Sequence, residues 1–222
     1  MKKKKDALNP AITRFPTPIN SKALDKSNGE KIKTIATHFR VIMETLGLDL
    51  TNDSLKDTPQ RVAKMYVNEI FSGLDPENFP DINFFPEEFH HEHRANTVLV
   101  KVSFTSFCEH HFVPMRGFAY VSYIPGKQLI GLSKIPRIVR YFSHRPQLQE
   151  RMTAQIADSL SILLETDDIA VSIIAKHYCV VTRGIEDSAS NTITNVLRGE
   201  FDRNDQIRRE FFEGINRELK EI

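Results

Sequence analysis

The strongest constraint on the fold is a run of alternating apolar residues that leads into the four residues Cys108-Glu109-His110-His111. Val98, Val100, Val102 and Phe104 share one face of an extended chain, because successive side chains of a strand point to opposite sides. The pattern predicts a strand that delivers a thiolate, a carboxylate and two imidazoles to one end of a sheet.

The chain has only one other cysteine, Cys179, which also lies beside a histidine in His177-Tyr178-Cys179. If residues 169–181 form a regular strand, the side chains of His177 and Cys179 point the same way. We therefore expect the fold to bring the two cysteine segments together around one metal ion.

Cys108 and His111 have the Cys-x-x-His spacing of many zinc sites, and Cys179 adds a third ligand of the type that zinc prefers. Closed structural zinc sites have four protein ligands, whereas three leave a position for water, whose pKa the metal lowers to about 7. No fourth ligand is obvious. His110 and His177 are candidates for it, but they could equally serve as acid and base, and spacing alone does not separate a catalytic from a structural zinc.

Composition narrows the class of protein. A chain of 222 residues with 40% hydrophobic and 27% charged residues fits a soluble globular enzyme of one or two domains, and no apolar run approaches the ~20 residues of a membrane span. The net charge of +1 gives no nucleic-acid footprint. Lys2–Lys5 is not followed by the apolar segment of a signal peptide, so we expect a cytoplasmic protein with reduced thiols.

The periodicity divides the chain into an irregular N-terminal arm (residues 1–28), a helical region (29–95) and a catalytic domain (96–222). Near the end of the helical region, His90, His91 and His93 could suggest a second metal site, but no flanking strand or helix would fix their geometry, so we expect a solvated loop. Helices followed by paired strands, two helices, two strands and a helix predict an α+β fold with antiparallel pairing. Two helices are expected at residues 30–46 and 58–71, and three more are expected to begin at Ser133, at Arg145, and at either Asn204 or Asp205. The other expected strands cover residues 117–124, 169–181 and 190–196.

Several separate blocks, in the same order, resemble GTP cyclohydrolase I over about residues 32–214. They are Asp57-Thr58-Pro59-Gln60-Arg61-Val62-Ala63-Lys64-Met65, Cys108-Glu109-His110-His111, Gly131-Leu132-Ser133-Lys134, Gln149-Glu150-Arg151, and His177-Tyr178-Cys179 with Arg183-Gly184.

The resemblance implies zinc-dependent hydrolysis and rearrangement of GTP to 7,8-dihydroneopterin triphosphate with release of formate, the entry to folate or tetrahydrobiopterin synthesis. The zinc ligands of the family fall on Cys108, His111 and Cys179, and its catalytic histidines fall on His110 and His177.

The family's substrate-binding positions give the remaining assignments. Glu150 would hold the guanine base, because a carboxylate offers two acceptors to the neighbouring N1–H and N2–H donors, and Gln149 lies beside it. The triphosphate would meet a local basic cluster with one hydroxyl, made of Arg61, Lys64, Ser133, Lys134, Arg137 and Arg183.

The resemblance also implies the tunnelling fold, in which antiparallel sheets of several subunits join into a barrel, and a homodecamer of two pentamers with active sites between subunits. Two other hypotheses stay open on the sequence alone. One is a zinc-stabilised binding module without turnover, and the other is a different pterin- or purine-binding enzyme of the same fold, which need not share the three zinc ligands.

Overall fold

The computed structural model describes residues 16–20, 22, 25–86, 97–126 and 128–220. The lysine run Lys2–Lys5 and the predicted loop histidines His90, His91 and His93 lie outside these residues. Within the described ranges, no helix combines the length and the apolar character that a membrane span needs.

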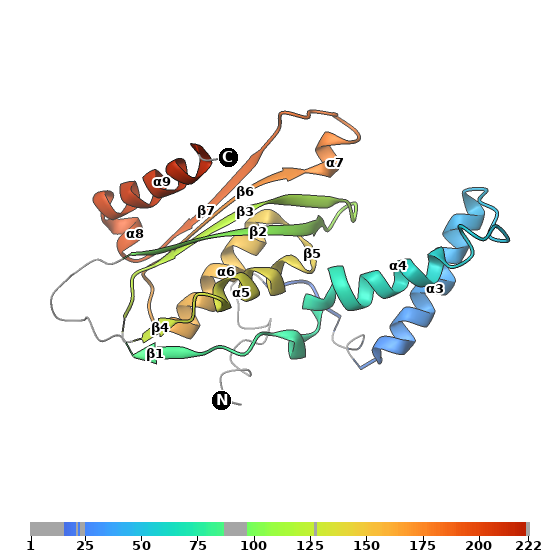
Figure 1. Ribbon diagram of the computed structural model, residues 1–222, viewed down its shortest axis with the longest axis horizontal. Coiled ribbons are helices and arrows are strands. Elements are labelled where there is room, and N and C mark those ends of the chain that lie inside the picture. Colours follow the sequence, from blue (N-terminus) through green and yellow to red (C-terminus); the bar gives the residue numbers. More distant parts are fainter. Residues whose placement is uncertain (1–15, 21, 23–24, 87–96, 127, 221–222) are drawn as a thin grey trace.

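The centre of the molecule is a five-stranded sheet in the order β5-β2-β3-β6-β7 (Figure 1). Neighbouring strands are antiparallel except for the short parallel pair β2 and β5. The predicted α+β fold with antiparallel pairing is therefore confirmed, with one parallel strand added at the edge. The strands are β2 (Val98–Cys108), β3 (Pro114–Tyr123), β5 (Pro146–Gln147), β6 (Ile169–His177) and β7 (Thr192–Leu197).

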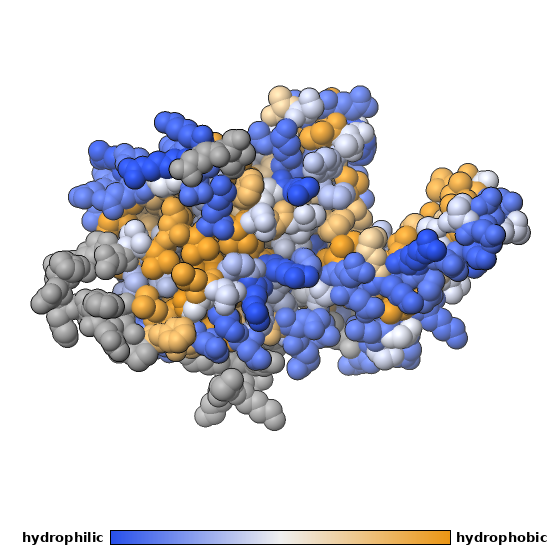
Figure 2. Space-filling view, viewed as in Figure 1, coloured by the Kyte–Doolittle hydropathy of each residue, from blue (hydrophilic) through white to orange (hydrophobic). Residues whose placement is uncertain are grey.

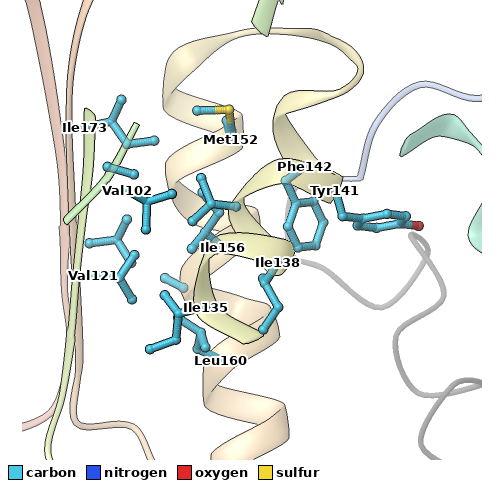
Figure 3. Close-up of a cluster of buried hydrophobic side chains, with 14 of the residues drawn as sticks. Val102, Val121, Ile135, Ile138, Tyr141, Phe142, Met152, Ile156, Leu160 and Ile173 are labelled. Carbon is cyan, nitrogen blue, oxygen red and sulfur yellow. The ribbon is translucent and has the colours of Figure 1, made fainter. Parts of the chain in front are cut away.

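Helices cover both faces of this sheet. On one face, α5 (Lys134–Ser143) and α6 (Gln149–Leu164) pack on the larger core, in which Val121 and Ile173 point toward Ile156 (Figure 3). On the other face, α8 (Glu200–Arg203) and α9 (Asp205–Lys220) cover a smaller core that contains Tyr120. Tyr120 and Val121 serve opposite cores because adjacent side chains of a strand alternate.

The next two helices, α3 (Asn28–Thr45) and α4 (Thr58–Met65), form a helical arm that projects beyond one end of the sheet and is separate from the N-terminal arm of residues 1–28 (Figure 1). Helix α3 begins with a capping box between Ser27 and Glu30, and it packs along α4. The two predicted N-terminal helices are confirmed, but the second continues as a π-helical turn η2 (Tyr66–Ile70). The remaining short elements are η3 (Ser72–Leu74), η4 (Pro76–Asn78), the helical turn α7 (Tyr178–Val181), and β1 (Phe84–Pro86) paired with β4 (Gln128–Ile130).

The segment between α5 and α6 differs from the prediction. A helix was expected from Arg145-Pro146, but Pro146 and Gln147 form β5 and pair with the end of β2, so α6 starts only at Gln149. The Gln147 carbonyl also accepts a hydrogen bond from the Glu109 amide at 3.0 Å. These backbone bonds to the segment around Cys108 hold residues 146 and 147 extended.

Arg145 is fully buried and anchors part of the N-terminal arm. Its Nη1 donates to the Thr17 hydroxyl at 3.0 Å, and Gln155 Nε2 donates to the same oxygen at 3.0 Å. The guanidinium also lies over the ring of Tyr141, with 4.4 Å between its carbon and the ring centroid. Thr17 is only 7% exposed, so this part of the predicted irregular arm is packed into the body.

The neighbouring His144 is half-buried and lies 3.3 Å from the Ser72 hydroxyl, measured from its Nδ1. Burial lowers the pKa of His144, the positive charge of Arg140 lowers it further, and a backbone interaction with Glu69 opposes the shift. The folded chain therefore favours the neutral imidazole.

Candidate active site

The two cysteine segments meet because three neighbouring strands begin or end at the same end of the sheet. Strand β3 lies between β2 and β6 and is antiparallel to both, so the end of β2, the start of β3 and the end of β6 lie together. Met115, near the start of β3, pairs with His177, the last residue of β6. Sequence reasoning placed Cys179 on the strand, but the strand stops at His177 and Cys179 lies in the helical turn α7 (Tyr178–Val181).

A tight loop after β2 fixes the other segment. The Cys108 amide donates to the Val113 carbonyl, and the Phe112 amide donates to the Cys108 carbonyl, both at 2.9 Å. Phe112 has a φ of 55°, a conformation that costs energy for a non-glycine residue. Its ring packs against Phe71 and Tyr66 at the base of the helical arm, with centroid distances of 5.2 and 6.3 Å, and these contacts hold the loop in place.

The predicted ligands Cys108, His111 and Cys179 form one group. Their ligand atoms all lie within 4.8 Å of one another, and Cys108 Sγ is 3.8 Å from His111 Nδ1. Two sulfurs and one imidazole form a set of soft and borderline donors that suits zinc and excludes the hard cations that prefer oxygen. This group could hold a metal ion, and within the described ranges it has three members, one fewer than a closed structural zinc site.

The surroundings of Cys179 favour its neutral thiol when no metal is bound. Burial raises the pKa of the Cys179 thiol, hydrogen bonding to Cys108 and the charge of Cys108 raise it further, and the positive charge of Arg183 opposes the rise. Because a metal ligand must be a thiolate, a cation between the sulfurs would offset the cost of deprotonating both. Arg183 also lies at the group, with its Nη1 3.0 Å from His111 Nε2.

The two predicted catalytic histidines have different surroundings. The side chain of His110 is 63% exposed, its Nδ1 lies 3.9 Å from Cys108 Sγ, and its Nε2 lies 4.0 Å from a Glu109 carboxylate oxygen. His177 is half-buried, and its Nε2 lies 2.7 Å from Gln149 Oε1. Burial lowers the pKa of His177, and the negative charge of Glu150 opposes that shift.

Gln149 and Glu150 face different environments although they are adjacent in the first turn of α6. Glu150 is exposed, as a base-binding carboxylate requires, and it is close enough to His177 for its negative charge to affect that imidazole. Gln149 is 1% exposed, and its amide makes hydrogen bonds to His177, to the carbonyls of Ile173 and Thr192 and to the Thr194 hydroxyl. The side chain predicted to contact substrate is thus already fully bonded inside the chain.

An ion pair that sequence reasoning missed links α6 to the loop of residues 109–113 after β2, which carries His111 and is called the metal loop below. Arg151 donates through Nη1 and Nη2 to the two carboxylate oxygens of Glu109, at 2.5 and 3.3 Å. The pair connects the residue after Cys108 to the residue after Glu150, and it gives Glu109 a partner. The sequence contained no signal for it, because the two residues lie 42 positions apart on elements whose relative placement depends on β5.

The six predicted triphosphate-binding residues divide into two groups. Ser133, Lys134 and Arg137 lie at the start of α5, where Ser133 makes no capping hydrogen bond, and Arg183 touches His111. Arg61 and Lys64 lie on α4 in the projecting arm. Lys64 lines a hollow of about 590 Å³ between α3 and α4, and Arg61 is 3.6 Å from Asp57. Among the residues described, no hydrogen bond or ion pair joins Arg61 or Lys64 to the metal-ligand group.

An α+β fold that presents an open Cys-His-Cys group beside two further histidines and an exposed carboxylate is typical of an enzyme whose site could hold a metal ion. Comparison with known proteins identifies its family. The sequence profile of GTP cyclohydrolase I matches residues 35–216. The chain is 52% identical to GTP cyclohydrolase 1 of Photobacterium profundum over 200 residues, which cover 90% of each chain. It is 54% identical to GTP cyclohydrolase 1 of Vibrio cholerae over 187 residues, 84% of this chain and 85% of the relative.

The chain therefore belongs to the GTP cyclohydrolase I family and is an enzyme of that class. The resemblance inferred from the separate sequence blocks is confirmed.

Proposed function

We propose that the protein converts GTP to 7,8-dihydroneopterin triphosphate with release of formate, as the first step of folate or tetrahydrobiopterin synthesis. The observation that carries this proposal is the convergence of Cys108, His111 and Cys179 from two distant segments to within 4.8 Å. Membership of the GTP cyclohydrolase I family supports the choice of substrate and reaction.

The proposed metal is Zn²⁺, held by Cys108, His111 and Cys179. The donor set supports this choice, since two thiolates and an imidazole match the ligands of catalytic zinc. When bound with an open position, zinc supplies Lewis acidity and a water activated at neutral pH.

His110 and His177 are proposed to move the protons. C8 of a purine becomes a good electrophile when N7 is protonated, so the reaction needs an acid beside the base. The exposure of His110, next to the ligand His111, supports its assignment as this acid. His177 is proposed to transfer protons at the ribose ring oxygen and in the later rearrangement, a role that its half-buried position and lowered pKa support.

Glu150 is proposed to hold the guanine N1–H and N2–H through its two carboxylate oxygens, and Gln149 was predicted to assist it. The triphosphate is proposed to lie against Ser133, Lys134, Arg137 and Arg183, with Arg61 and Lys64 completing the cluster. A chain with a net charge of +1 needs such a local cluster to attract a polyanion.

The finer features of fold and assembly belong to the same proposal: a tunnelling fold, sheets joined between subunits into a barrel, and a cytoplasmic homodecamer with sites between subunits. Strand β7 supports it, because β7 forms an edge of the sheet in the described part of the chain and Ile193 on it is 59% exposed. Apolar side chains are also uncovered at the far end of the helical arm (Figure 2), where Leu46 is 73% and Leu48 42% exposed.

We also propose that the division into an arm (1–28), a helical region (29–95) and a catalytic domain (96–222) reflects function. The ring contacts of Tyr66 and Phe71 with Phe112 support a role for the helical region in positioning the metal loop.

The test is GTP turnover by purified, zinc-loaded protein, followed by formate release and by pterin fluorescence after oxidation and dephosphorylation. We expect turnover that a chelator abolishes and added zinc restores. His110→Ala should retain zinc and lose activity, whereas His38→Ala, which removes an exposed histidine of α3, should behave like the wild type. Absence of formate release from zinc-loaded, assembled protein would refute the proposed reaction, and activity that resists complete zinc removal would refute zinc dependence.

A further inference from the structure

We propose that Gln149 is a positioning residue that fixes His177 in the tautomer with its hydrogen on Nε2, which leaves the Nδ1 lone pair for proton transfer. The catalytic consequence rests on the proposed function, whereas the tautomer follows from hydrogen bonds alone. Gln149 then acts through His177 instead of touching the substrate.

The orientation of the Gln149 amide is set first by two backbone carbonyls. Its Nε2 lies 3.0 Å from the Ile173 oxygen and 3.1 Å from the Thr192 oxygen. A backbone carbonyl can only accept hydrogen bonds, so both contacts require an N–H donor on Gln149. A flipped amide would place its oxygen against two other oxygens at a site that is 1% exposed, where solvent cannot relieve the repulsion.

A chain of hydroxyl groups sets the same orientation independently. Thr153 Oγ1 donates to the Gln149 backbone carbonyl at 2.7 Å, which uses its only hydrogen. Thr194 Oγ1 lies 2.7 Å from Thr153 Oγ1, so the Thr194 hydroxyl must donate in that contact. Thr194 can then only accept from the Gln149 side chain, at 3.1 Å, and the atom that faces it must be the amide nitrogen.

With the nitrogen placed, the Gln149 oxygen faces His177. Gln149 Oε1 lies 2.7 Å from His177 Nε2, and an amide oxygen has no hydrogen to give. His177 must therefore donate from Nε2. A neutral imidazole carries one hydrogen, so Nδ1 is the nitrogen with the free lone pair.

This assignment separates two roles that the sequence could not separate. Glu150 is exposed and available to the base, whereas the Gln149 amide nitrogen faces three acceptors on β6 and β7 and its oxygen faces His177. Loss of Gln149 should therefore impair the chemical step and leave GTP binding largely intact.

The first experiment is ¹⁵N solid-state NMR of zinc-loaded protein labelled at its histidine ring nitrogens and held at a pH where imidazole is neutral. The chain has eight histidines, and the His177 signals are those that disappear in His177→Asn. We expect a protonated Nε2 and an unprotonated Nδ1. The opposite tautomer, or a mixture, in the wild-type protein would overturn the proposal, and this outcome does not depend on GTP turnover.

The second experiment compares Gln149→Met with Thr194→Val, which removes one acceptor of the Gln149 amide and leaves the two carbonyls. For Gln149→Met with wild-type zinc content, we expect a mixed tautomer and a fall in kcat of roughly 10- to 100-fold, a part of the roughly 10²- to 10⁴-fold that a positioned general acid or base contributes, with KM changed less than about threefold. Thr194→Val should keep the tautomer and the kcat. A rise in KM at unchanged kcat for Gln149→Met would overturn positioning in favour of direct substrate contact.

Discussion

The ion pair between Glu109 and Arg151 offers the sharpest test of how the metal loop is held. The side chains are 21% and 16% exposed, so the pair lies between the surface class, worth up to about 1 kcal/mol, and fully buried pairs, whose disruption costs about 3–5 kcal/mol. We expect Glu109→Gln, which keeps the shape and removes the charge, to lower the free energy of unfolding by about 2 kcal/mol, roughly a 30-fold change in the unfolding equilibrium.

The measurement is a double-mutant cycle in chemical denaturation of the zinc-loaded protein, with Arg151→Met as the second change. Because both hydrogen bonds are charge-assisted and partly shielded from water, we expect a coupling free energy of about 1–2 kcal/mol. The matched control is the pair Glu200 and Arg203, which is 40% and 69% exposed at 3.0 Å. Glu200→Gln should cost less than about 1 kcal/mol. A coupling below about 0.5 kcal/mol between Glu109 and Arg151 would refute the view that this pair braces the loop.

Three further outcomes are expected. Gly117→Ala should destabilise the sheet by at least about 2 kcal/mol in thermal unfolding, because a Cβ there would lie 2.0 Å from the Ile174 carbonyl oxygen. Gly29→Ala should be within about 1 kcal/mol of the wild type, because its Cβ would make only an ordinary contact, 4.0 Å from the Ser27 hydroxyl oxygen. The lowered pKa of His144 means that the unfolded chain, with a histidine pKa of about 6.5, binds the proton first as pH falls. Stability should therefore be full above about pH 6.5 and decline below it, and His144→Gln should flatten that decline in denaturation curves taken at several pH values. Cys179→Ser should reduce bound zinc well below one ion per chain in metal analysis, and full occupancy would contradict its assignment as a ligand.

Sequence periodicity predicted the elements that bury whole faces. Strand β2 alternates Val102 and Phe104 toward the core with exposed Ser103 and Thr105 between them, which is the pattern that identifies a half-buried strand. Short elements could not be predicted, because they bury too few side chains to produce a recognisable hydrophobic periodicity. Strand β5 has two residues, α7 and α8 have four each, and their conformations are set by tertiary contacts.

Only those features of the candidate site that follow from residue type and sequence spacing could be predicted. Cys108 and His111 are three positions apart, so local spacing was enough to pair them, and a shared histidine neighbour pointed to Cys179. The difference in burial between exposed Glu150 and buried Gln149 could not be predicted. The two residues are adjacent at the start of α6, and their burial depends on which part of the fold each side chain faces. Gln149 faces the backbone of β6 and β7, whose position relative to α6 cannot be derived from the sequence.

The metal-ligand group also depends on more of the chain than its own two segments. In a zinc finger, the ligands are close in sequence and the metal organises a small unit. Here Cys108 ends β2 and Cys179 follows β6, and both strands pair with β3, so the two cysteines come together when the sheet forms. The N-terminal arm also supports this region, because Thr17 accepts hydrogen bonds from Arg145 and Gln155. Arg145 immediately precedes β5, whose Gln147 pairs with Cys108. Removing the Thr17 hydroxyl would leave a fully buried guanidinium with one partner fewer, and we expect the resulting loss of stability to loosen the segment that pairs with Cys108.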